Sequence, residues 1–134
     1  MNRLSYFLGM IALCFLVNNS CAGKYSDGEF MYKKVCANCH MDDGSGLVGL
    51  IPPLADADYL TNNLSNLPCI IRHGLSGPIT VNGRQYAGQD MAGIPVLTEV
   101  DITNIWNFMN TKFNYSNKEV SLQEVRKILE NCPK

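Results

Sequence analysis

The feature that most constrains this chain is a pair of cysteines followed at once by a histidine. Cys36 and Cys39 stand three positions apart, and His40 comes directly after the second thiol. Two thiols at this spacing can each add to one vinyl group of a haem, and the adjacent imidazole is then held beneath the iron as an axial ligand. The pattern therefore predicts one covalently bound haem c with His40 as a ligand of its iron.

A Cys-x-x-Cys pair also occurs in zinc sites and in thioredoxin-like redox motifs. A zinc site needs a second Cys/His pair, but Cys69, His73 and Cys132 are scattered along the chain. A redox pair normally opens a helix in a βαβ context, whereas this pair closes a predicted helix in a chain without predicted strands. Haem attachment is therefore the preferred interpretation.

Helix signals account for most of the chain after residue 21, and no segment is predicted to be a sheet. The segment 74–95 is rich in glycine and is expected to be a long ordered loop. The chain is therefore predicted to be all-α, with about four to five helices wrapped around the haem. Helices are expected to start at Ser26, at Asp56 or Asp58, after Pro68, at Thr98 and at Ser121. An apolar shell around the iron is expected from Phe30, Leu54, Tyr59, Leu60 and Ile94.

The second axial ligand must come from elsewhere in the chain. Met91 lies in the glycine-rich segment, which can bring a thioether over the iron. Met31 and Met109 fall on predicted helices, where Met usually fills core space, and Met41 is too close to the haem motif to reach the other face. Met91 is therefore the predicted ligand, with His73 as its competitor.

Residues 1–21 have the form of an export signal. Arg3 supplies a positive charge, and the apolar run Leu4–Val17 is shorter than the roughly 20 residues of a membrane-spanning helix. Two interpretations of Cys21 stay open: it carries a lipid, as in bacterial lipoproteins, or the protein is cut nearby and is soluble. The expected location is the periplasm, either free or anchored to the membrane and facing the periplasm.

Charge indicates no nucleic-acid partner. The chain has 11 basic and 12 acidic side chains, a formal net charge of -1, and no run of a single sign.

The two remaining cysteines, Cys69 and Cys132, are expected to pair in an oxidising compartment, the alternative being two separate buried thiols. Arg84 and Tyr86 are candidates to hydrogen-bond a haem propionate, or are an ordinary solvated Arg and a packed Tyr.

In their order along the chain, these residues resemble the class I mono-haem cytochromes c of bacterial electron-transfer chains. The resemblance extends from about Gly28 to Phe113. The family often has Pro directly after the distal Met, whereas here Ala92-Gly93-Ile94 intervene before Pro95. The matching elements are Gly28 and Tyr32 before the haem motif, Pro52-Pro53-Leu54 after it, Gly83 to Tyr86 before Met91, and a final helix from Leu97-Thr98 through Trp106 and Phe108.

This resemblance implies an electron carrier rather than an enzyme. It implies iron ligation by His40 and Met91, with the Pro52 carbonyl accepting the imidazole N–H. The domain is expected to cover residues 22–134, with a C-terminal helical extension at 119–132. The implied partners are redox proteins, namely a terminal oxidase, a reductase or a dehydrogenase. Two alternatives stay open: a lipid-anchored cytochrome docked permanently to one enzyme complex, and a small peroxidase or gas-binding protein with an open sixth position.

Overall fold

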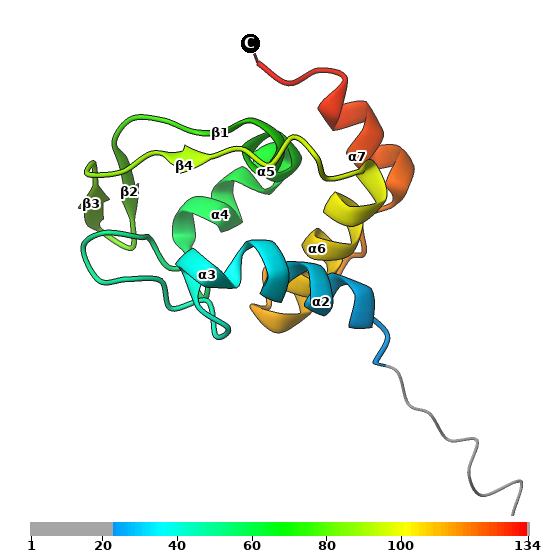
Figure 1. Cartoon of the computed structure of the whole chain (residues 1–134), viewed down its shortest axis with the longest axis horizontal. Helices are drawn as coiled ribbons and strands as arrows, with labels where there is room; N and C mark the ends of the chain where they lie inside the picture. Colours follow the sequence, from blue (N-terminus) through cyan, green and yellow to red (C-terminus); the bar gives the residue numbers. More distant parts are fainter. Residues whose placement is uncertain (1–22, 134) are drawn as a thin grey trace, which may run out of the picture.

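Helices dominate the part of the chain that this computed structural model describes, residues 23–133 (Figure 1). Two small antiparallel ladders complete it, β1 with β4 and β2 with β3. The α-helices are α2 (Ser26–Val35), α3 (Ala37–His40), α4 (Asp58–Asn63), α5 (Leu67–His73), α6 (Glu99–Lys112) and α7 (Leu122–Leu129), and a 3₁₀ helix spans Leu64–Asn66. The strands are β1 (Gly74–Leu75), β2 (Ile79–Val81), β3 (Arg84–Tyr86) and β4 (Met91–Ala92).

The predicted small helical fold is present, but the prediction that the chain is all-α is wrong for segment 74–95. Strands β2 and β3 form a hairpin whose two-residue turn is Asn82-Gly83, with φ angles of 51° and 74°. Such a turn needs positive φ at both residues, which Asn-Gly adopts readily, and its twist matches the flanking strands. The helices also exceed the expected four to five, because the short α3 follows α2 directly.

The predicted helix starts are partly right. Capping boxes begin α6, where Thr98 and Asp101 bond reciprocally, and α7, where Ser121 does so with Glu124. The cap predicted at Ser26 is wrong, because this residue already lies inside α2 and Tyr25 precedes it without a side-chain cap.

The cap predicted at Asp56 or Asp58 is also wrong. Asp58 is the first residue of α4, and its carboxylate accepts the N–H groups of Tyr59 and Asn82. This side chain therefore ties α4 to the turn of the hairpin. Pro68 stands in the first turn of α5, where its missing N–H costs nothing, and Gly74, with a φ of 87°, caps the end of the helix.

The core is centred on the crossing of α2 and α6. Gly28 of α2 is buried, and a Cβ built on it would overlap the backbone carbonyl of Asn104 and lie 2.8 Å from Phe108 Cβ. Tyr32, one helical turn further on, is fully buried, and its ring lies 5.4 Å from that of Phe108. An apolar stripe of α6 is also buried, namely Ile102, Ile105, Trp106 and Met109.

Phe30 was expected to face inward, and this prediction is wrong, because the side chain is 64% exposed. Gly28 and Tyr32 lie four residues apart and share the face toward α6. Phe30 stands halfway between them, about 200° around the helix from each, and so points away from the core.

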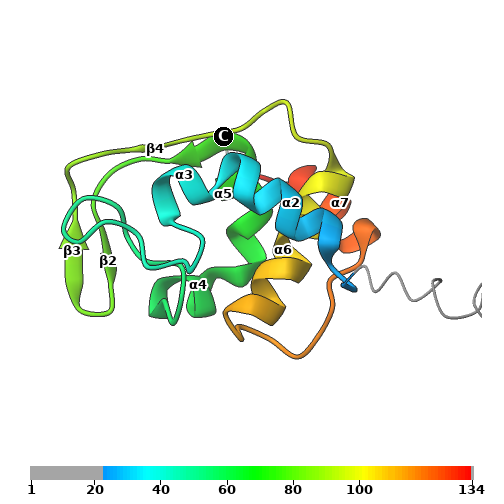
Figure 2. The same cartoon turned by 60° about the horizontal axis from the view of Figure 1, so that its bottom comes forward.

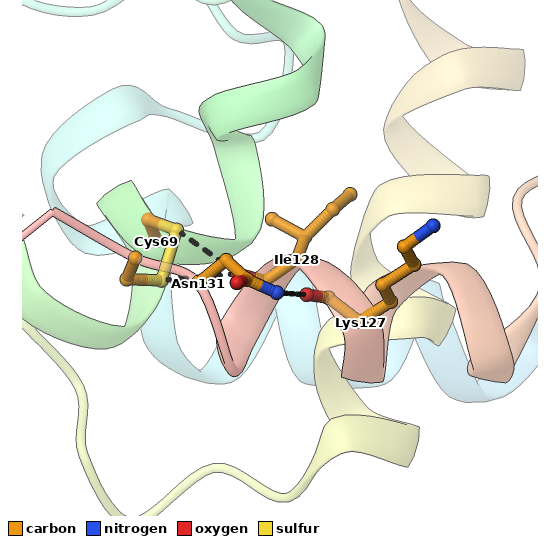
Figure 3. Close-up of a disulfide and its surroundings, with 5 residues drawn as sticks. Cys69, Lys127, Ile128 and Asn131 are labelled. Atoms are coloured by element: carbon orange, nitrogen blue, oxygen red, sulfur yellow. Dashed lines mark hydrogen bonds between the residues drawn. A yellow bond between two sulfur atoms is a disulfide. The ribbon is translucent and has the colours of Figure 1, made fainter.

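Helix α7 packs on α5 and α6 and buries Val125 completely. Its end is fastened by a disulfide between Cys69 of α5 and Cys132 (Figure 3). Beside this bond, Cys69 Sγ lies 3.8 Å from Ile128 O, and Asn131 donates to Lys127 O at 2.7 Å. The predicted C-terminal extension thus contains a helix, α7, which packs against α5 and α6.

The β2–β3 hairpin and the C-terminal helix α7 lie at opposite ends of the described domain (Figures 1 and 2). Figures 1 and 2 both show the β2–β3 hairpin beside the loop that follows α3, with α7 at the other end. The predicted export signal, residues 1–21 with Cys21, lies outside the described residues. Within residues 23–133, no helix is long and apolar enough to cross a bilayer.

We expect Gly28→Ala to lower the free energy of unfolding, because the new methyl group overlaps a backbone carbonyl that cannot rotate away. Overpacking of this kind costs about 1–3 kcal/mol, and the gain in helix propensity is at most roughly 1 kcal/mol. Chemical denaturation measures the difference. The matched control is Gly88→Ala, where an added Cβ meets no atom within 4 Å, and an equal loss in both variants would contradict the prediction.

The disulfide gives a second prediction. Peptide mapping without reduction should recover Cys69 linked to Cys132, and replacing both with Ser should lower stability. Their sequence separation is 63 residues, and loop-entropy estimates for such a closure give about 4 kcal/mol. Free thiols that react with an alkylating agent at both positions, in protein from an oxidising compartment, would show the prediction to be wrong.

Candidate haem-binding site

An apolar cavity of about 360 Å³ opens between the helices and the two ladders. This volume is within the range of sites that bury small molecules and cofactors. Its lining comes from α3 and the loop after it, from α4 and α5, and from the strands. Every residue predicted to hold the haem lines this one cavity, namely Cys36, Cys39, His40, Pro52 and Met91.

The surroundings of His40 determine the protonation state and the tautomer of its imidazole. The side chain is buried, and its Nδ1 lies 3.1 Å from Pro52 O. Burial lowers the pKa of His40, while the Pro52 carbonyl opposes this shift. The imidazole is therefore neutral at physiological pH, and because a carbonyl can only accept, Nδ1 carries the proton. The lone pair then resides on Nε2, which is the arrangement of a histidine that ligates a metal.

Met91 is positioned by close approach of two backbones. Strand β4 pairs with β1, with Met91 opposite Leu75, and Ile94 N donates to Ile71 O at 2.9 Å. A Cβ on Gly93 would lie 2.6 Å from Arg72 O, so only glycine allows β4 to lie so near the end of α5. The β1–β4 ladder thus anchors the segment around Met91, where no proline directly follows the methionine.

The competitor His73 occupies a different place. It is exposed at the end of α5 and does not line the cavity, whereas Met91 does. His73 comes directly before β1 and Met91 is the first residue of β4, but only the methionine borders the space beside His40.

The two cysteines of the motif are free thiols, Cys36 buried and Cys39 exposed. Burial raises the pKa of the Cys36 thiol to about 12, with a smaller contribution from Cys39. No three His, Cys, Asp or Glu side chains in residues 23–133 gather as a zinc site would require. Both cysteines instead line an apolar cavity, which fits thioether attachment of a haem better than a zinc site.

Most of the predicted apolar shell is in place. Leu54, Tyr59, Leu60 and Ile94 line the cavity, whereas Phe30 does not. Tyr86 also lines the cavity, while its neighbour Arg84 is exposed and does not. The lining residues that the sequence did not indicate come mainly from α5 and the hairpin, and include Ile70, Ile71, Leu75, Ile79 and Val81. The alternation Ile79-x-Val81 before Asn82-Gly83 is the signal that could have revealed the last two.

A model of the cytochrome c family matches residues 25–112, which contain the haem motif, the cavity lining and all of α6. The chain belongs to the cytochrome c family. It is 30% identical over 125 residues to cytochrome c-552 of Thermus thermophilus, an alignment that covers 87% of this chain and 83% of that protein. It is 31% identical over 104 residues to the cytochrome c subunit of alcohol dehydrogenase (quinone) from Gluconacetobacter polyoxogenes, covering 75% of this chain and 22% of that subunit.

Membership of this family establishes the cofactor and the general role. The chain is a cytochrome c that binds haem c covalently and carries electrons. Helix α7, the disulfide partner Cys132 and the segment after α6 lie beyond the matched residues.

Proposed function

We propose that this cytochrome is a periplasmic electron carrier with one haem c, attached through Cys36 and Cys39 and ligated by His40 and Met91. The observation that carries the proposal is that all four side chains line one apolar cavity, although Met91 is far from the others in sequence. Residues 22–134 form the carrier domain in this proposal, and residues 1–21 direct its export.

Each side chain has a distinct task in this arrangement. The haem iron supplies a one-electron couple when bound. The neutral His40 offers Nε2 while Pro52 fixes its orientation through Nδ1. The Met91 thioether is a soft ligand that favours the reduced iron and raises the potential. With both His40 and Met91 as ligands, the iron would have no position open to a substrate or a gas, and the chain would act as a carrier rather than an enzyme.

The surroundings of the site favour rapid electron exchange. The apolar lining keeps water from the metal, so little solvent reorganises when the charge on the iron changes. The partners in this proposal are redox proteins, namely a dehydrogenase, a reductase or a terminal oxidase. The similarity to a subunit of a quinone-dependent alcohol dehydrogenase supports a partner of the dehydrogenase type. Attachment to the membrane depends on a lipid at Cys21, and without it the carrier diffuses freely.

Haem attachment is tested by the mass of the mature protein. Produced with a cytochrome c maturation system, the chain should gain the mass of one haem, which survives acid–acetone extraction. Replacing Cys36 and Cys39 together with Ala should abolish this gain, because no thiol is left for the vinyl groups.

The matched control replaces Cys69 and Cys132, which should leave the haem attached. A mature wild-type protein without the haem mass would contradict the proposed attachment.

Ligation by Met91 is tested by Met91→Ala. The haem should stay covalently bound, but the thioether-to-iron charge-transfer band of the oxidised protein should vanish and the potential should fall. The reduced variant should also bind CO readily, because its sixth position is open. His73→Ala should change none of these properties, and the reverse pattern would show that two histidines ligate the iron.

A further inference from the structure

Two tyrosine hydroxyls contact the two ends of loop 41–54, which forms most of the connection between α3 and α4. Tyr32 of α2 donates to Met41 O at 2.8 Å, at the start of this loop. Tyr115, which follows α6, donates to Leu54 O at its end. The ring of Phe113 lies between the two phenols, 5.8 Å from Tyr32 and 5.9 Å from Tyr115. The three rings therefore form one packed unit, the tyrosine clamp, that contacts both ends of loop 41–54.

The loop is closed on itself between these two contacts. Gly44 O accepts from Leu54 N at 2.7 Å and from Ala55 N at 3.0 Å, so its beginning and end are bonded to each other. A Cβ on Gly44 would lie 2.6 Å from the Phe113 ring, which brings this closure directly against the clamp. If the contacts of the clamp were weakened, loop 41–54 would therefore shift as one unit.

The start of the loop is strained. Met41 has a φ of 64°, an uncommon conformation for a residue with a side chain, and it comes directly after His40. Such a conformation persists only where surrounding contacts hold it. The Tyr32 hydroxyl and the Gly44 N–H both donate to the Met41 carbonyl and supply two such contacts.

The loop carries the carbonyl that orients the proximal imidazole. Pro52 stands two residues before Leu54, and its oxygen accepts from His40 Nδ1. We propose that Tyr32 and Tyr115 are positioning residues that hold this loop so that Pro52 bonds His40, and that they thereby lower the reduction potential. The inference rests on the proposed function, in which His40 ligates the iron.

The sign of the effect follows from the chemistry of the imidazole. A strong bond from Nδ1–H to a carbonyl makes the other nitrogen more basic, and a more basic ligand stabilises the oxidised iron. Loosening the bond therefore raises the potential. Burial raises the pKa of both phenols well above the ordinary value, so both stay protonated donors at physiological pH.

The test compares Tyr32→Phe and Tyr115→Phe with the control Tyr25→Phe in the intact haem-bound protein. Each change removes one hydroxyl and keeps the ring, and the hydroxyl of Tyr25 donates to the Glu119 carboxylate, away from the loop. Two quantities are measured, the midpoint potential and the solvent-exchange rate of His40 Nδ1–H in the reduced, ¹⁵N-labelled protein.

Both clamp variants should show a higher potential and faster exchange of this proton, while Tyr25→Phe should match the wild type. The exchange rate should rise about three- to tenfold, the factor that corresponds to losing one neutral hydrogen bond.

If both clamp variants melt at a lower temperature but keep the wild-type potential and exchange rate, the tyrosines only stabilise the fold and the inference is overturned. The wild-type spectrum separates this failure from that of the proposed function. If His40 in the wild type lacks the shifts of an iron-bound imidazole, the ligation itself is wrong, whatever the variants do.

Discussion

The contact between His40 Nδ1 and the Pro52 carbonyl is the constraint on which much of this structure depends. A buried imidazole without a partner would leave one N–H unsatisfied and its tautomer undefined. The carbonyl removes both problems, but only if the chain returns to His40 after twelve residues. The turns at Gly44 and Gly46, the strained Met41 and the two tyrosine hydroxyls all serve that return.

On the Met91 side of the cavity, the chain is positioned by close packing between backbones. There a short strand lies against the end of α5 because Gly74 and Gly93 have no side chains to keep the backbones apart. Helix α5 is itself fastened to the C-terminal helix through Cys69 and Cys132. The disulfide therefore stabilises the helix against which the Met91 strand is anchored, although it lies outside the cavity.

Local chemical signals predicted the cofactor and the longer helices well. The Cys-x-x-Cys-His motif and the capping boxes at Thr98 and Ser121 depend only on residues close in sequence, so they can be read directly. The glycine-rich composition of segment 74–95 indicates a loop, whereas the hairpin within it depends on the two-residue turn signal Asn82-Gly83.

The side chains that depend on tertiary packing were harder to predict. The exposure of Phe30 follows from the helix face that Gly28 and Tyr32 occupy, which is known only once α6 is in place. The contact of Tyr115 with Leu54 joins residues 61 positions apart, and no local pattern indicates it. Ligation by Met91 remains a proposal, since its place in the cavity lining supports it without testing it.

Nuclear magnetic resonance of the reduced wild-type protein, labelled with ¹³C at the methionine methyl groups, tests that ligation most directly. A methyl group held over the porphyrin by a bond from its sulfur to the iron is shifted far upfield by the ring current. We predict one such resonance, and we predict that it is absent from the Met91→Leu variant. A spectrum in which every methionine methyl group has an ordinary shift, or in which the shifted resonance persists in Met91→Leu, would contradict the proposed His40 and Met91 ligation.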